Sequence, residues 1–95
     1  MNEVALHFSA FADLVARQVR RRLPAARYEP PKEPNGPARL SVPGATATMM
    51  RDRAFWRVMF ERLDRPITMS GLSGERFDEF VAGNVGSSIA TFLEP

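Results

Sequence analysis

Proline is the residue that most restricts how this chain can fold. Six of the eight prolines lie between positions 24 and 43, and residues 29–37 (EPPKEPNGP) alone hold four of them. Proline has no backbone N–H to donate and its φ angle is fixed, so this segment can be neither a helix nor a central strand. We therefore predict a mobile, extended Pro-rich segment over residues 29–37, with regular structure on either side.

Apolar residues recur at helical spacing on both sides of this segment. Residues 3–23, 49–64 and 74–93 each carry one apolar face. Pro24 ends the first stretch, and Ser73 precedes the third as a candidate N-cap. The spacing predicts a mainly α fold of three to four helices, with the Pro-rich loop between the first and the second.

A short β-hairpin is the alternative for the middle of the chain. Residues 40–42 and 45–48 flank the turn-forming pair Pro43-Gly44. Two strands around this turn, within residues 39–48, would make the fold α+β instead.

The helical spacing also predicts one shared core. Its expected members come from all three amphipathic stretches, and their truncation should destabilise the fold. They are Phe8, Phe11, Val15, Val19, Trp56, Phe60, Leu63, Phe77, Val81, Val85 and Ile89.

Length and composition restrict the class of protein. With 95 residues there is room for a single domain, predicted over residues 1–95. The chain has no cysteine, which excludes disulfides, thiolate nucleophiles and cysteine-ligated zinc. No apolar run is long enough to span a bilayer, and the first residues do not resemble a secretory signal. We therefore expect a cytoplasmic protein with no membrane partner.

The residues needed for catalysis or cofactor binding are missing as a set. His7 is the only histidine, so no histidine-rich metal site can form. Its neighbour Ser9 lies two positions along the predicted helix and points away from it. The glycine-containing segments 71–74 and 83–86 lack the spacing of phosphate-binding loops. These observations predict a non-enzymatic protein without cofactor or metal.

Arginine dominates the positive charge. Lys32 is the only lysine among thirteen basic residues, and the end of the first predicted helix is the densest cluster. In the simplest interpretation, these arginines offset the helix dipole and attract the acidic C-terminal stretch. The functional interpretation is a surface for phosphate or for an acidic protein, and nucleic acid is therefore an alternative partner. The cluster comprises Arg17, Arg20, Arg21, Arg22 and Arg27.

Large flexible and aromatic side chains are dense in the second predicted helix. They lie on more faces than one core contact can cover, so some of them could bind a partner. The simplest interpretation places them all in the core. The group comprises Met49, Met50, Phe55, Trp56, Met59 and Phe60.

Small residues recur at every fourth position late in the chain. Ala82, Gly86 and Ala90 would let two helices approach closely. The contact could be internal, against the first helix, or it could join two copies in a homodimer.

These patterns together predict a small protein that acts by binding another protein. We expect a bacterial or phage-type regulator, inhibitor or adaptor, and a nucleic-acid-binding module using the Arg cluster is the alternative. The expected contact surface combines the arginines with the exposed members of the Met and aromatic group, and charge would orient an acidic partner. Its candidate residues are Arg17, Arg20, Arg21, Arg27, Met49, Met50, Phe55 and Trp56.

Overall fold

The computed structural model describes residues 6–64, 66 and 71–95. It begins with helix α1 (Phe8–Arg22), whose buried residues follow the predicted stripe through Phe11, Val15 and Val19. The helix starts later than predicted because Leu6 and His7 are not helical. It ends one residue before Leu23, which caps it ahead of Pro24. The prediction that Phe8, Phe11, Val15 and Val19 of the first helix are buried in the core is thus confirmed.

The prediction of a mainly α fold is wrong, because five strands between Arg27 and Gly74 form an antiparallel sheet. Its five strands lie in sequence order, each paired with the next. The structure is therefore α+β, and the hairpin alternative at residues 39–48 is the one that it supports. The strands are β1 (Arg27–Glu29), β2 (Ala38–Val42), β3 (Ala45–Asp52), β4 (Phe55–Arg62) and β5 (Gly71–Gly74).

Two tight turns set the register of the three central strands. Val42 pairs with Ala45 across Pro43-Gly44, where Gly44 has a φ of 86°. Asp52 pairs with Phe55 across a second two-residue turn, where Arg53 has a φ of 58°. Glycine adopts positive φ without steric cost, so the sequence predicts the first turn, which contains Gly44, but not the second.

The predicted helix over residues 49–64 is replaced by the end of β3 and by β4. Along β4 the odd and even positions alternate between exposed and buried, as a strand requires. Trp56 and Phe60 are four residues apart and therefore share a face in a strand as well as in a helix. Leu63, which only the helix would bury, is 89% exposed. The four-residue spacing of Trp56 and Phe60 therefore could not distinguish a strand from a helix.

Helix α2 (Glu79–Leu93) is the third predicted helix, shortened at its start. Asp78 caps it instead of Ser73, since the Asp78 carboxylate accepts a hydrogen bond from the Val81 N–H. Residues 71–74 belong to β5. Neither Gly83 nor Gly86 interrupts the helix.

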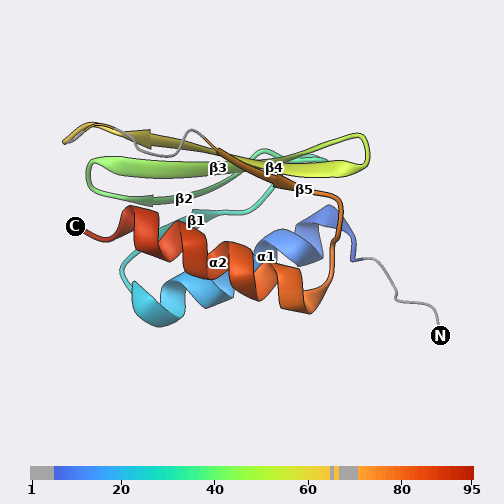
Figure 1. Ribbon diagram of the computed structural model, residues 1–95, viewed down its shortest axis with the longest axis horizontal. Helices are drawn as coiled ribbons and strands as arrows, with labels where there is room; N and C mark the ends of the chain where they lie inside the picture. The colour runs from blue at the N-terminus through green and yellow to red at the C-terminus, as the bar shows by residue number, and fades with distance from the viewer. Residues whose placement is uncertain (1–5, 65, 67–70) are drawn as a thin grey trace.

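Both helices lie on the same side of the sheet and pack against each other (Figure 1). The core between helices and sheet is one cluster of buried residues. Aromatic rings lie at its centre, where Phe11 contacts both Trp56 and Phe77 at centroid distances of 5.9 and 5.3 Å. Neither α1 nor α2, the two helices of the described residues, lies on the opposite face of the sheet.

The Pro-rich segment connects β1 to β2. Its later part is held to the sheet, because the Asn35 carbonyl accepts a hydrogen bond from the Arg51 N–H at 2.9 Å. A side chain at Gly36, whose φ is 95°, would meet the Phe8 ring at 3.0 Å.

Mobility of residues 29–37 stays a prediction, and these contacts refine it. We expect the backbone order parameters from ¹⁵N relaxation to be lowest over residues 31–34 and to rise at Asn35. Few buried contacts hold the first part, whereas a hydrogen bond holds the second. Order parameters at or above about 0.85 throughout would contradict it.

The cap of α2 predicts a pH dependence of stability. The hydrogen bond from the Val81 N–H, followed by the contact with Arg76, holds the pKa of Asp78 below its ordinary value. A group whose pKa is lower in the folded state stabilises that state above its unfolded pKa of about 3.9 and loses the effect as pH falls through the folded value. We expect the Tm difference between the unchanged protein and Asp78→Asn to shrink below about pH 4, because asparagine caps without titrating. Thermal unfolding followed by circular dichroism from neutral to acid pH checks this. A difference that does not change with pH would mean that the charge of Asp78 plays no part.

Candidate interaction surface on the open face of the sheet

The side of the sheet that faces away from α1 and α2 carries exposed and half-buried side chains of all five strands. Alternation along each strand sends every second side chain away from the helices. The face is named here the open face. It is formed by Arg27, Glu29, Arg39, Ser41, Thr46, Thr48, Met50, Asp52, Phe55, Arg57, Met59, Glu61, Gly71 and Ser73.

An apolar patch lies on β3 and β4 of the open face and runs from the turn that connects them toward the middle of β4. Phe55 and Met59 are 43% and 52% exposed, and Met50 is half-buried beside them. Met50 lies opposite Arg57, which separates Phe55 from Met59 along β4. Met50 is thus a diagonal neighbour of both Phe55 and Met59 on one face, close enough for long side chains to touch.

Charged residues surround this patch in equal numbers. Arg57 and Asp52 form an ion pair at 3.6 Å in which both side chains stay more than half exposed. Glu29 lies directly opposite Arg39 in the register of β1 and β2. Three arginines and three carboxylates make the open face electrically neutral, so long-range attraction to a charged partner is small. They are Arg27, Arg39, Arg57, Glu29, Asp52 and Glu61.

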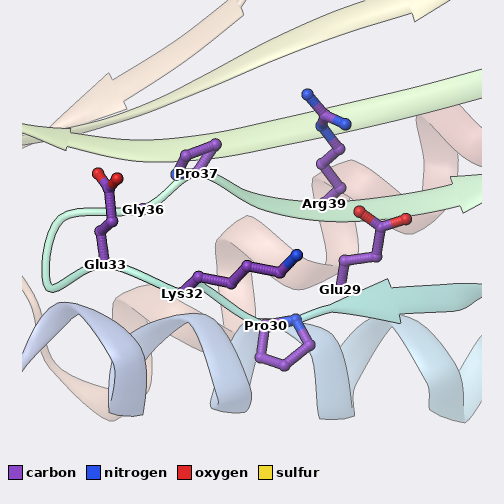
Figure 2. Close-up of a pocket in the computed structure, with 7 residues that line it drawn as sticks. All are labelled: Glu29, Pro30, Lys32, Glu33, Gly36, Pro37 and Arg39. Atoms are coloured by element: carbon purple, nitrogen blue, oxygen red, sulfur yellow. The ribbon is translucent and has the colours of Figure 1, made fainter.

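Two shallow hollows extend from the open face at its two sides. The first lies between the Pro-rich segment and β2, where Glu29, Glu33 and Arg39 rise on the same side of the ribbon (Figure 2). The second lies along β5, between the side chains of Arg57 and Met59. Gly71 lines it without a side chain, and a Cβ there would meet the Val58 carbonyl oxygen at 2.7 Å. Hollows of mixed charge and open shape suit a protein contact better than an enclosed reaction site.

The structure distributes the predicted contact residues over three places. Arg27, Met50 and Phe55 lie on the open face. Met49 and Trp56 are buried in the core, where the Trp56 indole donates a hydrogen bond to the Arg76 carbonyl at 2.9 Å. The expectation that these two could contact a partner is therefore corrected. In a strand, adjacent residues point to opposite faces, so Met49 and Met50 must separate, as must Phe55 and Trp56.

The predicted Arg cluster lies elsewhere. Arg17, Arg20 and Arg21 are exposed on α1, around a shallow hollow next to Tyr28 of β1. Because α1 lies on the helix-covered side of the sheet, these arginines do not share a surface with the Met50–Phe55–Met59 patch. The single combined surface expected from the sequence is in fact two.

The small-residue stripe of α2 lies inside the molecule. Ala82 and Ala90 are fully buried, and Gly86 lies against Val15 and Gln18 of α1. This is the internal contact that the sequence left open as one of two alternatives. With α1 in place the stripe has no surface to offer a second copy.

The sequence analysis did not identify the polar residues that surround Met59 on the open face. Arg57, Thr46 and Thr48 have no role in a helical interpretation, yet all three lie on the open face. The alternation of threonine with alanine over residues 45–48 is a strand signal that could have located them.

The acidic and histidine side chains, the types that could bind a metal ion here, are scattered over the described part of the chain. Within the described residues no three acidic or histidine side chains gather as a metal site. His7 is exposed at the start of α1 and its side chain makes no capping bond. No helix in the described part of the chain is long and apolar enough to cross a membrane.

Comparison with known proteins adds no relative to this description. No protein-family model matches the chain, and neither a curated protein nor a solved structure matches it at a significant level.

Proposed function

We propose that this chain is a small non-enzymatic binding protein, a regulator, inhibitor or adaptor that acts by covering part of a larger protein. Its contact surface is the open face of the sheet. The partner surface that fits has an apolar area with both signs of charge around it. The supporting observation is the exposure of Phe55 and Met59, with Met50 beside them, on the sheet face opposite α1 and α2 (Figure 1).

An antiparallel sheet can have one face in water without any function, and such a face is normally polar. Phenylalanine and methionine are among the residue types enriched at protein interfaces. Here two of them are about half exposed along β4, Phe55 beside the turn that begins the strand and Met59 in the middle of it. This arrangement resembles a binding hot spot, in which a few apolar anchors inside a polar rim supply most of the affinity.

The size of the face indicates a reversible complex. Strand spacing and rise make it about 19 Å by 27 Å, or roughly 500 Å² in projection. A standard stable interface covers about 800 Å² on each partner. We therefore expect exchange between bound and free forms, which suits a regulator or adaptor better than a permanent subunit.

Site-specific photo-crosslinking in extracts of the native host tests the proposed surface. A photoreactive phenylalanine analogue at position 55 should crosslink one protein, and this should persist after nuclease treatment and in high salt. The matched control places the same analogue at Ser88, which is exposed on α2 away from the sheet. Equal crosslinking from both positions would overturn the proposal, and so would crosslinking from position 55 to nucleic acid alone.

A double variant then measures the contribution of the patch. Phe55→Ser with Met59→Ser should weaken binding of the crosslinked protein at least about tenfold, as loss of hot-spot anchors does. Its thermal midpoint should stay close to that of the unchanged protein, because both side chains are about half exposed. Unchanged affinity in this variant would show that the patch is not the contact.

Nucleic-acid binding through the Arg cluster is the second candidate function. Its support is the exposure of Arg17, Arg20 and Arg21 together on α1. The two candidate functions differ in their salt dependence. Affinity for nucleic acid falls steeply as the salt concentration rises, whereas binding through an apolar protein contact does not.

A further inference from the structure

We infer that the hollow beside α1 is a docking site for an acidic peptide segment, separate from the open face. The inference deepens the proposed function, because it gives the bound protein a second, charged contact. The α1 hollow is lined by Asp13, Ala16, Arg17, Arg20, Arg21, Pro24 and Tyr28.

The three arginines of the hollow share one side of α1. They lie at positions i, i+3 and i+4, so their side chains emerge within about one helical turn. All three are exposed and lie off the stripe that Val15 and Val19 bury in the core. Three guanidinium groups therefore converge on a small area.

No carboxylate of the described residues neutralises them. Four other arginines of the described chain are held in ion pairs, Arg22 with Glu94, Arg57 with Asp52, Arg62 with Asp64 and Arg76 with Asp78. Arg17, Arg20 and Arg21 belong to no such pair with any residue between 6 and 64 or from 71 onward. The hollow thus keeps a local excess of positive charge, with three arginines against the one carboxylate of Asp13.

The single carboxylate in the hollow already has a partner. The Tyr28 hydroxyl donates a hydrogen bond to Asp13 Oδ1 at 2.7 Å. Partial burial, together with this bond and the charge of Asp13, raises the pKa of Tyr28, so the phenol stays neutral. The contact ties β1 to α1 and fixes the shape of the hollow. Tyr28, Pro24 and Ala16 supply apolar surface between the charges.

The footprint favours a peptide over nucleic acid. Specific nucleic-acid binding commonly neutralises about six to ten phosphates along a continuous path. Here only three arginines line the hollow, and they span about one helical turn. Arg27, the residue before Tyr28, points to the other face of β1 and does not extend the patch. Two or three carboxylates of an acidic segment match three arginines. Each planar guanidinium group can donate a pair of hydrogen bonds to one carboxylate.

Fluorescence anisotropy with a labelled oligoglutamate peptide tests the inference at low salt. The unchanged protein should bind the peptide, and Arg20→Gln with Arg21→Gln should weaken binding about tenfold or more, as loss of charge-assisted hydrogen bonds predicts. Asp13→Asn should strengthen binding, because it removes the repelling charge and leaves an acceptor for Tyr28. The matched control Arg53→Gln removes one charge from an exposed turn far along the chain and should leave affinity unchanged.

Competitors decide the kind of ligand. An oligothymidylate of equal charge, or inorganic phosphate alone, should displace the peptide poorly. Stronger displacement by the oligonucleotide would overturn the inference in favour of nucleic acid, and equal displacement by phosphate would reduce the hollow to a nonspecific anion site. Absence of peptide binding, or an equal loss in Arg53→Gln, would also overturn it.

The test is independent of the open face. The variant Phe55→Ser with Met59→Ser should bind oligoglutamate as the unchanged protein does. Loss of the crosslinked partner in that variant with retained peptide binding supports both proposals. Failure of the unchanged protein to bind oligoglutamate would overturn the inference about the α1 hollow alone. The open-face proposal is tested separately, by the crosslinks from position 55.

Discussion

Alanine at Gly86 and alanine at Gly83 are expected to change stability in opposite directions, although both glycines lie in α2. A Cβ at Gly86 would lie 2.6 Å from Gln18 Cβ and 2.9 Å from the Val15 carbonyl oxygen. Such distances are too short for carbon, and the backbone of α1 cannot rotate away as a side chain could. A Cβ at Gly83 would meet nothing within 4 Å.

The expected sizes follow from two competing terms. Replacing glycine with alanine inside a helix stabilises it by about 1 kcal/mol, and this gain applies at both positions. Overpacking between α1 and α2 costs about 1–3 kcal/mol and applies only at Gly86. Gly83→Ala should therefore raise the Tm by a few degrees, while Gly86→Ala lowers it and Gly86→Leu lowers it much further.

Differential scanning calorimetry of the three variants checks this pair of predictions. The Gly83 variant is the control for helix propensity, because it makes the same chemical change on the same helix. A higher Tm for both alanine variants would show that α1 and α2 do not approach as closely as the structure has them.

Phe11→Ala should cost most of the stability of the protein. The ring is 1% exposed and contacts the rings of Trp56 and Phe77, so its removal leaves a cavity where helix and sheet meet. Loss of a buried phenylalanine costs about 3–5 kcal/mol. Domains of this size have about 5–15 kcal/mol in total, so the variant should be partly unfolded near physiological temperature.

Phe80→Ala is the matched control for this loss. Phe80 is 71% exposed on α2, so the same truncation should change the free energy of unfolding by less than about 0.5 kcal/mol. Urea titration followed by tryptophan fluorescence measures both. A cost for Phe11→Ala no larger than that for Phe80→Ala would contradict the core as described.

The two proposed contacts also explain why charge and apolar surface need not be found together. The open face is neutral and carries an apolar patch, whereas the α1 hollow is positive and small. An acidic segment bound at the hollow would keep its protein near the open face, and linking two weak contacts raises the overall affinity.

The sequence by itself determined the features that depend on local spacing. The stripe of Phe8, Phe11, Val15 and Val19 can be buried on one side only by a helix, because a spacing of three would send Phe8 and Phe11 to opposite faces of a strand. Proline at position 24 stops that helix wherever it packs. Pro43-Gly44 encodes a tight turn for the same local reason. The exposure of Arg17, Arg20 and Arg21 follows from the stripe, since residues off the buried face must meet water.

Only the tertiary structure decided what residues 49–62 become and which of their side chains a partner could touch. A spacing of four, as between Trp56 and Phe60, satisfies both a helix and a strand, so local pattern could not choose. The choice came from the pairing of β3 with β4 over eight register positions. That pairing depends on a turn in which Arg53 has a positive φ, and arginine is not a residue type that predicts such a turn. Once the segment is a strand, Phe55 and Met50 turn outward while Trp56 and Met49 turn inward. The same packing brings α1 against α2, which buries Ala82, Gly86 and Ala90 and places the arginines on a different surface from the apolar patch.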